Sequence, residues 1–316
     1  MSTFPDGLYQ YGGQPVTSVN EARAGGDTFW VWSNGNDGYT GRTPDAAFRT
    51  LARAVHVAEE YDTILIRASH WPYVSSSAQG QYAYLETDIP INITQQGLKI
   101  VGQQTTPWML GSPTLHAHNT YNLVNHPDGA HMGTLTEPLI TINANNVEIS
   151  NLTIQMQIAE KGILIANTNY VNRVYIHDVA FNGASSIGTY GLYLTTVPES
   201  LGVVVERCFF VDWLTAAIVF TSGQGSAVKD CIFIIPDSST GIILSNTGKP
   251  NGTFILNNRL IAQGSSSYGI TYAAGGVGDV MIDGNHSCGF TSVQDYPTYA
   301  TSYFGANYRN GALVVA

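Results

Sequence analysis

A six-residue phrase of alternating apolar and polar positions recurs along the second half of the chain. Each copy begins with a β-branched residue, and in all but the last copy the sixth position is a large apolar residue. Successive copies start roughly 23–29 residues apart, a period typical of solenoid repeats. The six copies begin at Ile149, Ile176, Val205, Val228, Ile255 and Ile282.

The third position of the phrase is usually Asn or Asp, and Arg207 and Gly284 are the exceptions. Because these short side chains bond to neighbouring backbone and tolerate unusual dihedrals, we expect a tight corner between two strands at this position. Stacked from coil to coil, the third-position side chains are predicted to form a polar ladder. The Asn and Asp members are Asn151, Asp178, Asp230 and Asn257.

Each repeat holds two or three short runs rich in β-branched residues, separated by Gly, Asn, Asp and Ser. Such runs are too short for helices and predict strands. One unit cannot bury its apolar face alone, whereas stacked units form a continuous core with rungs about 4.8 Å apart. The sixth-position residues are therefore predicted to form one interior column: Ile154, Phe181, Phe210, Phe233 and Leu260.

A strand, a turn rich in Gly and Asn, and an amphipathic helix are predicted between Phe29 and Val55, before a strand at residues 62–66. One face of this helix is apolar, and a helix laid across the open end of a solenoid covers its core and its edge strand. Pro44 suits the first helical turn, and Thr43 or Thr50 suits the N-cap. The apolar face consists of Leu51, Ala54, Val55 and Ala58.

These repeats and this entry segment resemble the right-handed parallel β-helix of the pectate-lyase-like superfamily, from about Phe29 to Cys288. The resemblance implies an all-β solenoid with an N-terminal capping helix at about 44–60. We expect an N-terminal anchoring arm at 1–27, the β-helix at 28–290 with a long insertion at about 103–138, and a C-terminal cap or tail at 291–316. The resemblance is specific for fold and does not fix function.

Composition limits the classes of partner. Only 11% of residues are charged and the net charge is −10, so nucleic acid and anionic membranes are not expected partners. The chain shows no run of apolar residues long enough to span a membrane, and no secretory signal is recognisable at its start. Cys208 and Cys231 fill the same slot of consecutive phrases, and we expect reduced, buried thiols rather than a disulfide.

Paired carboxylates are the chemistry of glycoside hydrolases. Asp178 and Glu206 lie on adjacent predicted rungs, roughly 5–6 Å apart and near the range of retaining enzymes. Asp230 lies two rungs from Asp178, just beyond the inverting range. Corner carboxylates of any such solenoid make pairs of this kind, and no cluster of Asp with neighbouring Lys or Arg is recognisable. We therefore predict no catalytic site; an enzyme would be a polysaccharide lyase or a glycoside hydrolase with these three carboxylates as its candidates.

Half of the eight histidines fall in the predicted insertion at 103–138. His116 and His118 are two residues apart, so on a strand they face the same side and are candidate metal ligands. One such residue from each subunit of a threefold oligomer would meet on its axis. No recognised ligand spacing accompanies them, and we predict neither a metal nor a cofactor.

The N-terminal arm is rich in aromatic residues and resembles the opening segments of bacteriophage virion proteins. We expect a structural virion protein, a homotrimer that decorates or cements a capsid, bound to the major capsid protein or another virion protein. The alternatives are a tailspike that binds or depolymerises a host surface glycan, and a cellular enzyme acting on polysaccharide. The predicted particle-anchoring residues are Phe4, Leu8, Tyr9, Tyr11 and Val16.

Overall fold

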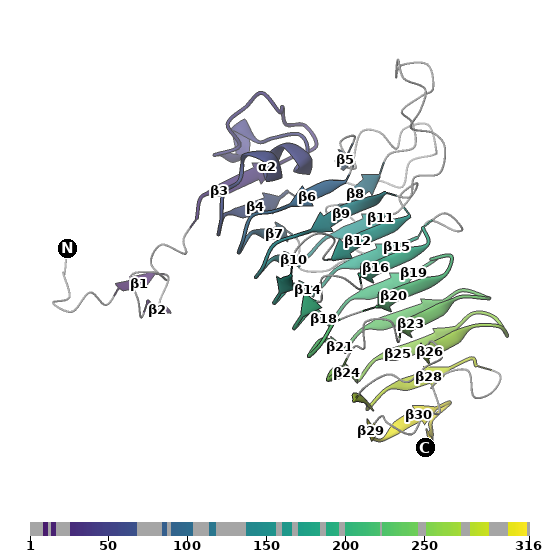
Figure 1. Ribbon diagram of the computed structural model, residues 1–316. Helices are drawn as coiled ribbons and strands as arrows, with labels where there is room; N and C mark the ends of the chain where they lie inside the picture. The colour runs from purple at the N-terminus through teal and green to yellow at the C-terminus, as the bar shows by residue number, and fades with distance from the viewer. Residues whose placement is uncertain are drawn as a thin grey trace, which may run out of the picture.

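The computed structural model describes most of the chain (Figure 1). The described residues are 9–11, 14–16, 26–67, 84–86, 90–103, 114–117, 137–155, 160–165, 170–183, 188–195, 200–221, 223–245, 251–272, 279–290 and 303–314.

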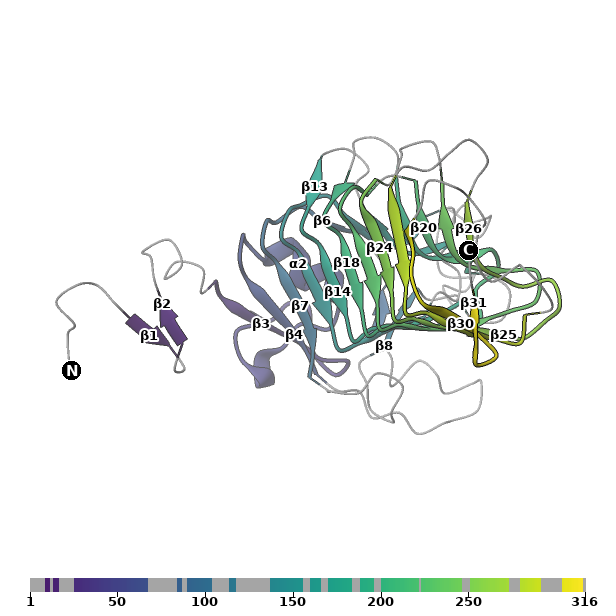
Figure 2. The ribbon, with the colours of Figure 1, turned by 90° about the horizontal axis from the view of Figure 1, so that it is seen from below.

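Three parallel sheets wrap around one elongated core, and the chain visits them in turn with each coil. The first sheet contains β3 (Thr28–Val31), β4 (Thr63–Ile66), β7 (Lys99–Gly102), β10 (Glu148–Ser150), β14 (Tyr175–His177), β18 (Val204–Glu206), β21 (Ala227–Lys229), β24 (Thr253–Leu256), β27 (Val280–Asp283) and β29 (Tyr303–Phe304). Figure 2 shows its successive strands side by side down the molecule.

The other two sheets complete each coil. The second sheet contains β5 (Tyr84–Glu86), β8 (Thr114–Ala117), β11 (Thr153–Gln155), β15 (Ala180–Asn182), β19 (Phe209–Val211), β22 (Ile232–Ile235), β25 (Arg259–Ala262), β28 (His286–Cys288), β30 (Asn307–Arg309) and the antiparallel β31 (Ala312–Val314). The third contains β6 (Ile91–Ile93), β9 (Pro138–Ile142), β12 (Lys161–Ile165), β16 (Tyr190–Leu194), β20 (Ala216–Phe220), β23 (Thr240–Leu244) and β26 (Tyr268–Tyr272).

Two short pairs lie outside these sheets. They are the parallel pair β13 (Val171–Asn172) with β17 (Ser200–Leu201), and the antiparallel pair β1 (Tyr9–Tyr11) with β2 (Gln14–Val16). The predicted all-β parallel β-helix is therefore confirmed.

The predicted interior column of sixth-position residues is confirmed. The five side chains pair in register from β11 to β25, and each is at most 1% exposed. Phe181, Phe210 and Phe233 stack face to face, with ring centroids 4.7 and 4.9 Å apart. The spacing of the rings matches the spacing of the strands, so the aromatic stack stabilises successive coils in one register.

The third position of every phrase is a corner with positive φ, as predicted. The two exceptions to the Asn/Asp pattern adopt the same backbone, with φ of 49° at Arg207 and 68° at Gly284. The predicted ladder, however, is formed by the fourth position. Asn258, Asn285 and Asn307 are fully buried, and the amide of each of the first two donates to the side-chain oxygen of the next.

The fourth position carries the ladder because it points inward, whereas the third position lies at the surface corner. Each ladder oxygen also accepts the backbone N–H of the preceding rung, and in this way Asn258 accepts from Cys231. Cys208 and Cys231 continue the same column as free, buried thiols, as predicted. The ladder thus satisfies polar backbone groups inside an otherwise apolar core.

The capping helix is shorter than predicted. A 3₁₀ turn (η1, Pro44–Ala46) precedes the helix α2 (Leu51–Val57), and residues 47–50 between them are not helical. The carboxylate of Asp37 accepts the N–H groups of Arg49 and Thr50, and the Thr50 hydroxyl caps α2 by accepting from Arg53. The predicted apolar face is buried, and α2 packs beside β3, β4 and β6 at the N-terminal end (Figure 1).

Two predicted boundaries were wrong. The insertion at 103–138 is not outside the repeat, because β8 continues the second sheet between β5 and β11. The β-helix also does not end at residue 290, because β29 and β30 extend the first and second sheets. The antiparallel β31 then covers the edge of β30, which agrees with the predicted capping role of the tail.

Several predicted anchoring positions lie outside what the structure describes. Phe4 and Leu8 are outside the described residues, while Tyr9, Tyr11 and Val16 fall in β1 and β2, where only the backbone is described. Among the described residues, no helix is long and apolar enough to cross a membrane.

Candidate functional site

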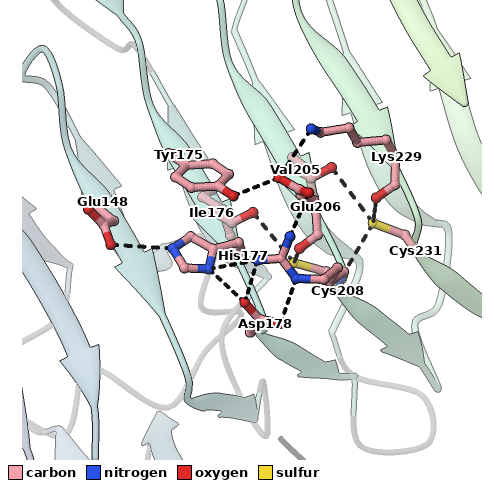
Figure 3. A network of polar contacts seen from close by, with 11 residues as sticks. Glu148, Tyr175, Ile176, His177, Asp178, Val205, Glu206, Cys208, Lys229 and Cys231 are labelled. Atoms are coloured by element: carbon pink, nitrogen blue, oxygen red, sulfur yellow. Dashed lines mark hydrogen bonds and ion pairs between the residues drawn. The ribbon is translucent and has the colours of Figure 1, made fainter. Parts of the chain in front are cut away.

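The outer face of the first sheet carries a network of charged and polar side chains (Figure 3). Residues alternate between core and solvent along each short strand, so the second position of the phrase points outward. On β14, β18 and β21 this position is His177, Glu206 and Lys229, which pair in register on consecutive rungs. Glu148 and Tyr175 occupy the second outward row, on β10 and β14.

Arg207 is the centre of the network. Its Nε donates to Asp178 Oδ1 at 3.0 Å and its Nη2 to Asp178 Oδ2 at 2.7 Å, while its Nη1 lies 2.5 Å from Glu206 Oε1. The structure therefore brings Asp178 and Glu206 together, as their adjacent rungs predicted. They meet through a shared guanidinium and not as a bare carboxylate pair.

Three further side chains contact oxygens of these carboxylates. The Tyr175 hydroxyl donates to Glu206 Oε2 at 2.6 Å, and Lys229 Nζ lies 3.2 Å from the same oxygen. On the other side, His177 Nδ1 lies 2.7 Å from Asp178 Oδ2. The His177 ring stacks on the Tyr175 ring with centroids 4.2 Å apart, which fixes both side chains against the sheet.

The network continues toward the N-terminal coils through Glu148. Its Oε1 lies 3.3 Å from His177 Nε2, and its Oε2 lies 3.4 Å from Lys99 Nζ. The chain of contacts from Lys99 to Lys229 thus crosses five consecutive strands of the first sheet, from β7 to β21.

The backbone of Arg207 departs from the pattern of its column. Four corners hold Asn or Asp and one holds Gly, residue types that adopt positive φ at low cost, but Arg207 adopts a φ of 49°. A long side chain in this conformation costs of order 1 kcal/mol and persists where the surroundings fix it. The ion pairs of Arg207 supply that constraint.

Both central carboxylates remain ionised at neutral pH. Desolvation by burial raises the pKa of Asp178, but the hydrogen bonds from Arg207 and His177 outweigh it and the net pKa is lowered. Burial likewise raises the pKa of Glu206, and its contacts with Tyr175, Lys229 and Arg207 reverse the shift. Neither group is suited to donate a proton as a general acid, which requires a raised pKa.

The remaining predicted site residues are not part of this network. Asp230 is exposed at the corner one rung beyond Arg207, and the contacts described for the network end at Lys229. His116 lies on β8, where only the backbone is described, and His118 is outside the described residues. Among the described residues, no group of three His, Cys, Asp or Glu side chains is placed to hold a metal.

The sequence prediction missed most of the network, because it found no cluster of Asp with neighbouring basic residues. Such a cluster exists, and three of its contacts join residues 29–31 apart in sequence. The available signal was positional: aligning the phrases places His177, Glu206 and Lys229, all ionisable residue types, at the second position of three consecutive copies. The missed members are Lys99, Glu148, Tyr175, His177, Arg207 and Lys229.

A second polar group lies on the outer face of the third sheet. Lys161 Nζ lies 2.9 Å from Glu160 Oε2 and is also 5.9 and 5.6 Å from the ring centroids of Tyr190 and Tyr193. The two rings meet edge to face with centroids 5.1 Å apart. Burial raises the pKa of both tyrosines, so their hydroxyls stay neutral.

Comparison with known proteins identifies the fold. No family model and no curated protein matches the sequence. Among solved structures, a rhamnogalacturonan lyase is similar over 91% of this chain and 75% of its own, with a TM-score of 0.57 and 14% identity. A pectin methylesterase mutant in complex with a hexasaccharide is similar over 90% of both chains, with a TM-score of 0.56 and 16% identity.

The pectate lyase Pel9A is similar over 92% of this chain and 78% of its own, with a TM-score of 0.53 and 10% identity. The chain therefore has the parallel β-helix fold of pectate-lyase-like proteins. At these identities the likeness extends to the fold alone.

Proposed function

We propose that this protein is a structural, non-catalytic β-helix that assembles as a homotrimer on the surface of a bacteriophage particle. One observation carries the non-catalytic part: the guanidinium of Arg207 occupies the position between the two candidate carboxylates. A retaining glycosidase needs one protonated acid and one free nucleophile, with the two carboxyl groups about 5–5.5 Å apart. Asp178 and Glu206 are instead both ionised and both bound to cations.

The same contacts have a structural role. Most of these contacts join side chains of neighbouring rungs, as between Glu148 and His177, Asp178 and Arg207, and Glu206 and Lys229. The network therefore links successive coils on one face, while the phenylalanine stack links them in the core. Solenoid stability is a sum of such contacts between neighbouring repeats. The outer network and the inner phenylalanine stack would both keep a scaffold rigid along its axis.

The location on a particle is supported by the likeness of the N-terminal arm to virion proteins, described above. In this proposal the arm anchors the trimer to a capsid protein through Phe4, Leu8, Tyr9, Tyr11 and Val16. Deletion of residues 1–20 is expected to leave the β-helix folded, because its first strand, β3, begins at Thr28.

Quantitative mass spectrometry of purified particles tests this location. We expect a copy number comparable with that of the major capsid protein, and loss of particle binding after deletion of residues 1–20. Absence from particles, or a copy number typical of a single tail, contradicts capsid decoration. Normal binding by the truncated protein contradicts anchoring by the arm.

A second candidate function is glycan binding on the third sheet. The observation in its favour is the Lys161 ammonium placed beside Tyr190 and Tyr193. Aromatic rings pack against sugar rings while a neighbouring ion pair bonds to their hydroxyls. A glycan array tests this function: binding that is lost in Tyr193→Ala but kept in Tyr170→Ala, a tyrosine exposed elsewhere, would favour it over the scaffold.

A further inference from the structure

The outer face of the second sheet is apolar over three consecutive rungs. On β22 the core residues Phe233 and Ile235 alternate with Ile232 and Ile234, which point outward and are partly exposed. The partly exposed Val211 on β19 and Ile261 on β25 pair in register with Ile234. Three β-branched side chains thus form an outward row along the axis, with Ile232 beside it; we call these four residues the apolar patch.

The apolar patch differs from an ordinary solvated sheet face. An antiparallel or solenoid strand with one face in water normally carries polar residues at its outward positions. Here the outward positions of β22 are both isoleucine, and a row of partly exposed apolar side chains of this kind suits a protein–protein contact better than contact with water. At its two ends, Asn182 on β15 pairs in register with Val211, and the exposed Cys288 on β28 pairs with Ile261; Arg259 pairs with Ile232 at its side.

Charge distinguishes this face from that of the first sheet. The outward positions of β19, β22 and β25 include one charged residue, Arg259. The first sheet carries the whole ion network on its outer side. The outward positions of these three strands hold no carboxylate. Because the chain has a net charge of −10, two copies approach through them with less repulsion than through the acidic face of the first sheet.

We propose that the apolar patch is the contact through which copies of this chain associate, side by side with their long axes parallel. This inference rests on the assembly part of the proposed function and adds the surface that assembly uses. A second copy fits the patch because it brings an apolar row with the same rise of about 4.8 Å per rung and no charge to desolvate. The patch forms the centre of the contact and the bordering polar residues its rim.

Parallel packing around a closed axis also places equivalent rungs at equal height. The Ile234 rows of neighbouring copies then face one another, and Arg259 stays at the margin, where it is exposed. Closed cyclic symmetry uses the face completely and prevents open-ended polymerisation of a rod. Three copies is the expected number.

Sedimentation velocity across a concentration series tests the proposal with Ile234→Glu. We expect the wild type to sediment as a trimer and the variant to dissociate, with a dissociation constant raised by at least about 100-fold, because a buried carboxylate would lack a partner. The matched control is Leu256→Glu, the same change at a partly exposed position on the outer face of the first sheet. It is expected to remain trimeric.

Thermal unfolding of each variant separates dissociation from misfolding. If Ile234→Glu does not fold, Ile234→Thr tests the contact instead, because threonine keeps the β-branched shape that suits a strand. We expect this milder variant to be folded and to associate about 10-fold more weakly than the wild type. A monomeric wild type, or folded Ile234 variants that associate as tightly as Leu256→Glu, would overturn the proposal.

The two proposals fail in different ways. A trimer that depends on Ile234 but is absent from phage particles contradicts the particle location and supports this contact. A protein that is abundant on particles, and whose trimer does not depend on Ile234, supports the particle location and contradicts this contact.

Discussion

Arg207 donates two hydrogen bonds to the carboxylate of Asp178, the residue that occupies the same corner of the preceding coil. Both residues have positive φ, 49° and 53°. The column that turns the chain between the first and second sheets therefore also places the cation of Arg207 beside the anion of the preceding rung. The third position of the phrase thus forms the backbone turn and also supplies an ion pair on the outer face.

Substitution of Arg207 separates these two roles. Arg207→Asn removes the ion pairs but introduces a residue type that tolerates positive φ, whereas Arg207→Ala removes the ion pairs and leaves a residue that disfavours positive φ. We expect Arg207→Ala to be less stable than Arg207→Asn by about 1 kcal/mol. Arg207→Asn itself should lie less than about 1 kcal/mol below the wild type, because the guanidinium is 45% exposed and solvent screens its pairs.

Chemical denaturation of the three proteins measures these differences. Added salt should narrow the gap between wild type and Arg207→Asn, which depends on screened charges, and leave the gap between the two variants unchanged. Equal stability of the Asn and Ala variants would show that the corner backbone imposes no constraint.

The stability of the protein should fall in acid. The pKa values of Asp178 and Glu206 are lowered in the folded state, so the unfolded chain binds protons first as the pH falls. Their contribution is fully present above the ordinary carboxyl pKa of about 4 and is lost as the pH falls through the lower folded values. The double variant Asp178→Asn/Glu206→Gln should show a flatter loss of stability below that pH. Parallel acid profiles of the two proteins would contradict the assigned shifts.

The phenylalanine stack should dominate core stability. Phe210 is fully buried between Phe181 and Phe233, so Phe210→Ala is expected to lower the free energy of unfolding by about 3–5 kcal/mol. Phe254, which is 41% exposed on β24, provides the control. Phe254→Ala should cost about 1 kcal/mol or less. A loss of similar size in both variants would argue against the interior column as the main contact between coils.

The asparagine ladder gives a second matched comparison. Asn285 accepts from the amide and backbone N–H of Asn258 and donates to the Ile255 carbonyl, so Asn285→Ala leaves buried polar groups unpaired. We expect a loss of about 2–3 kcal/mol in the free energy of unfolding. Asn257→Gly, at the exposed corner next to the ladder, should be close to neutral because glycine also adopts positive φ. A larger loss of stability in Asn257→Gly than in Asn285→Ala would indicate that the third position, and not the fourth, carries the ladder.

The periodic part of the sequence predicted the periodic part of the structure. The sixth-position residues determined the core column, and the Asn and Asp residues located the corners, because burial and positive φ each leave a strong preference for residue type. The fourth position was misleading. Asn258 and Asn285 look like further turn residues, and only the inward direction of the side chains, set by the corner geometry, identifies them as a buried ladder.

The candidate site was predictable in part. The proximity of Asp178 and Glu206 followed from rung spacing alone. The roles of Arg207 and His177 did not, because their partners are about one repeat away in sequence and depend on the exact register of parallel strands. The strand β8 within the predicted insertion was missed for a related reason: a strand of four residues with long flanking segments leaves little periodic signal.

The central claim is that the outer-face carboxylates hold coils together and catalyse no reaction. The most direct measurement compares the wild type with Asp178→Asn/Glu206→Gln for release of reducing sugar and unsaturated uronide from a panel of acidic and neutral polysaccharides, alongside thermal unfolding. We predict no release by either protein and a lower unfolding temperature for the variant. Release by the wild type that is lost in a folded variant would contradict the claim.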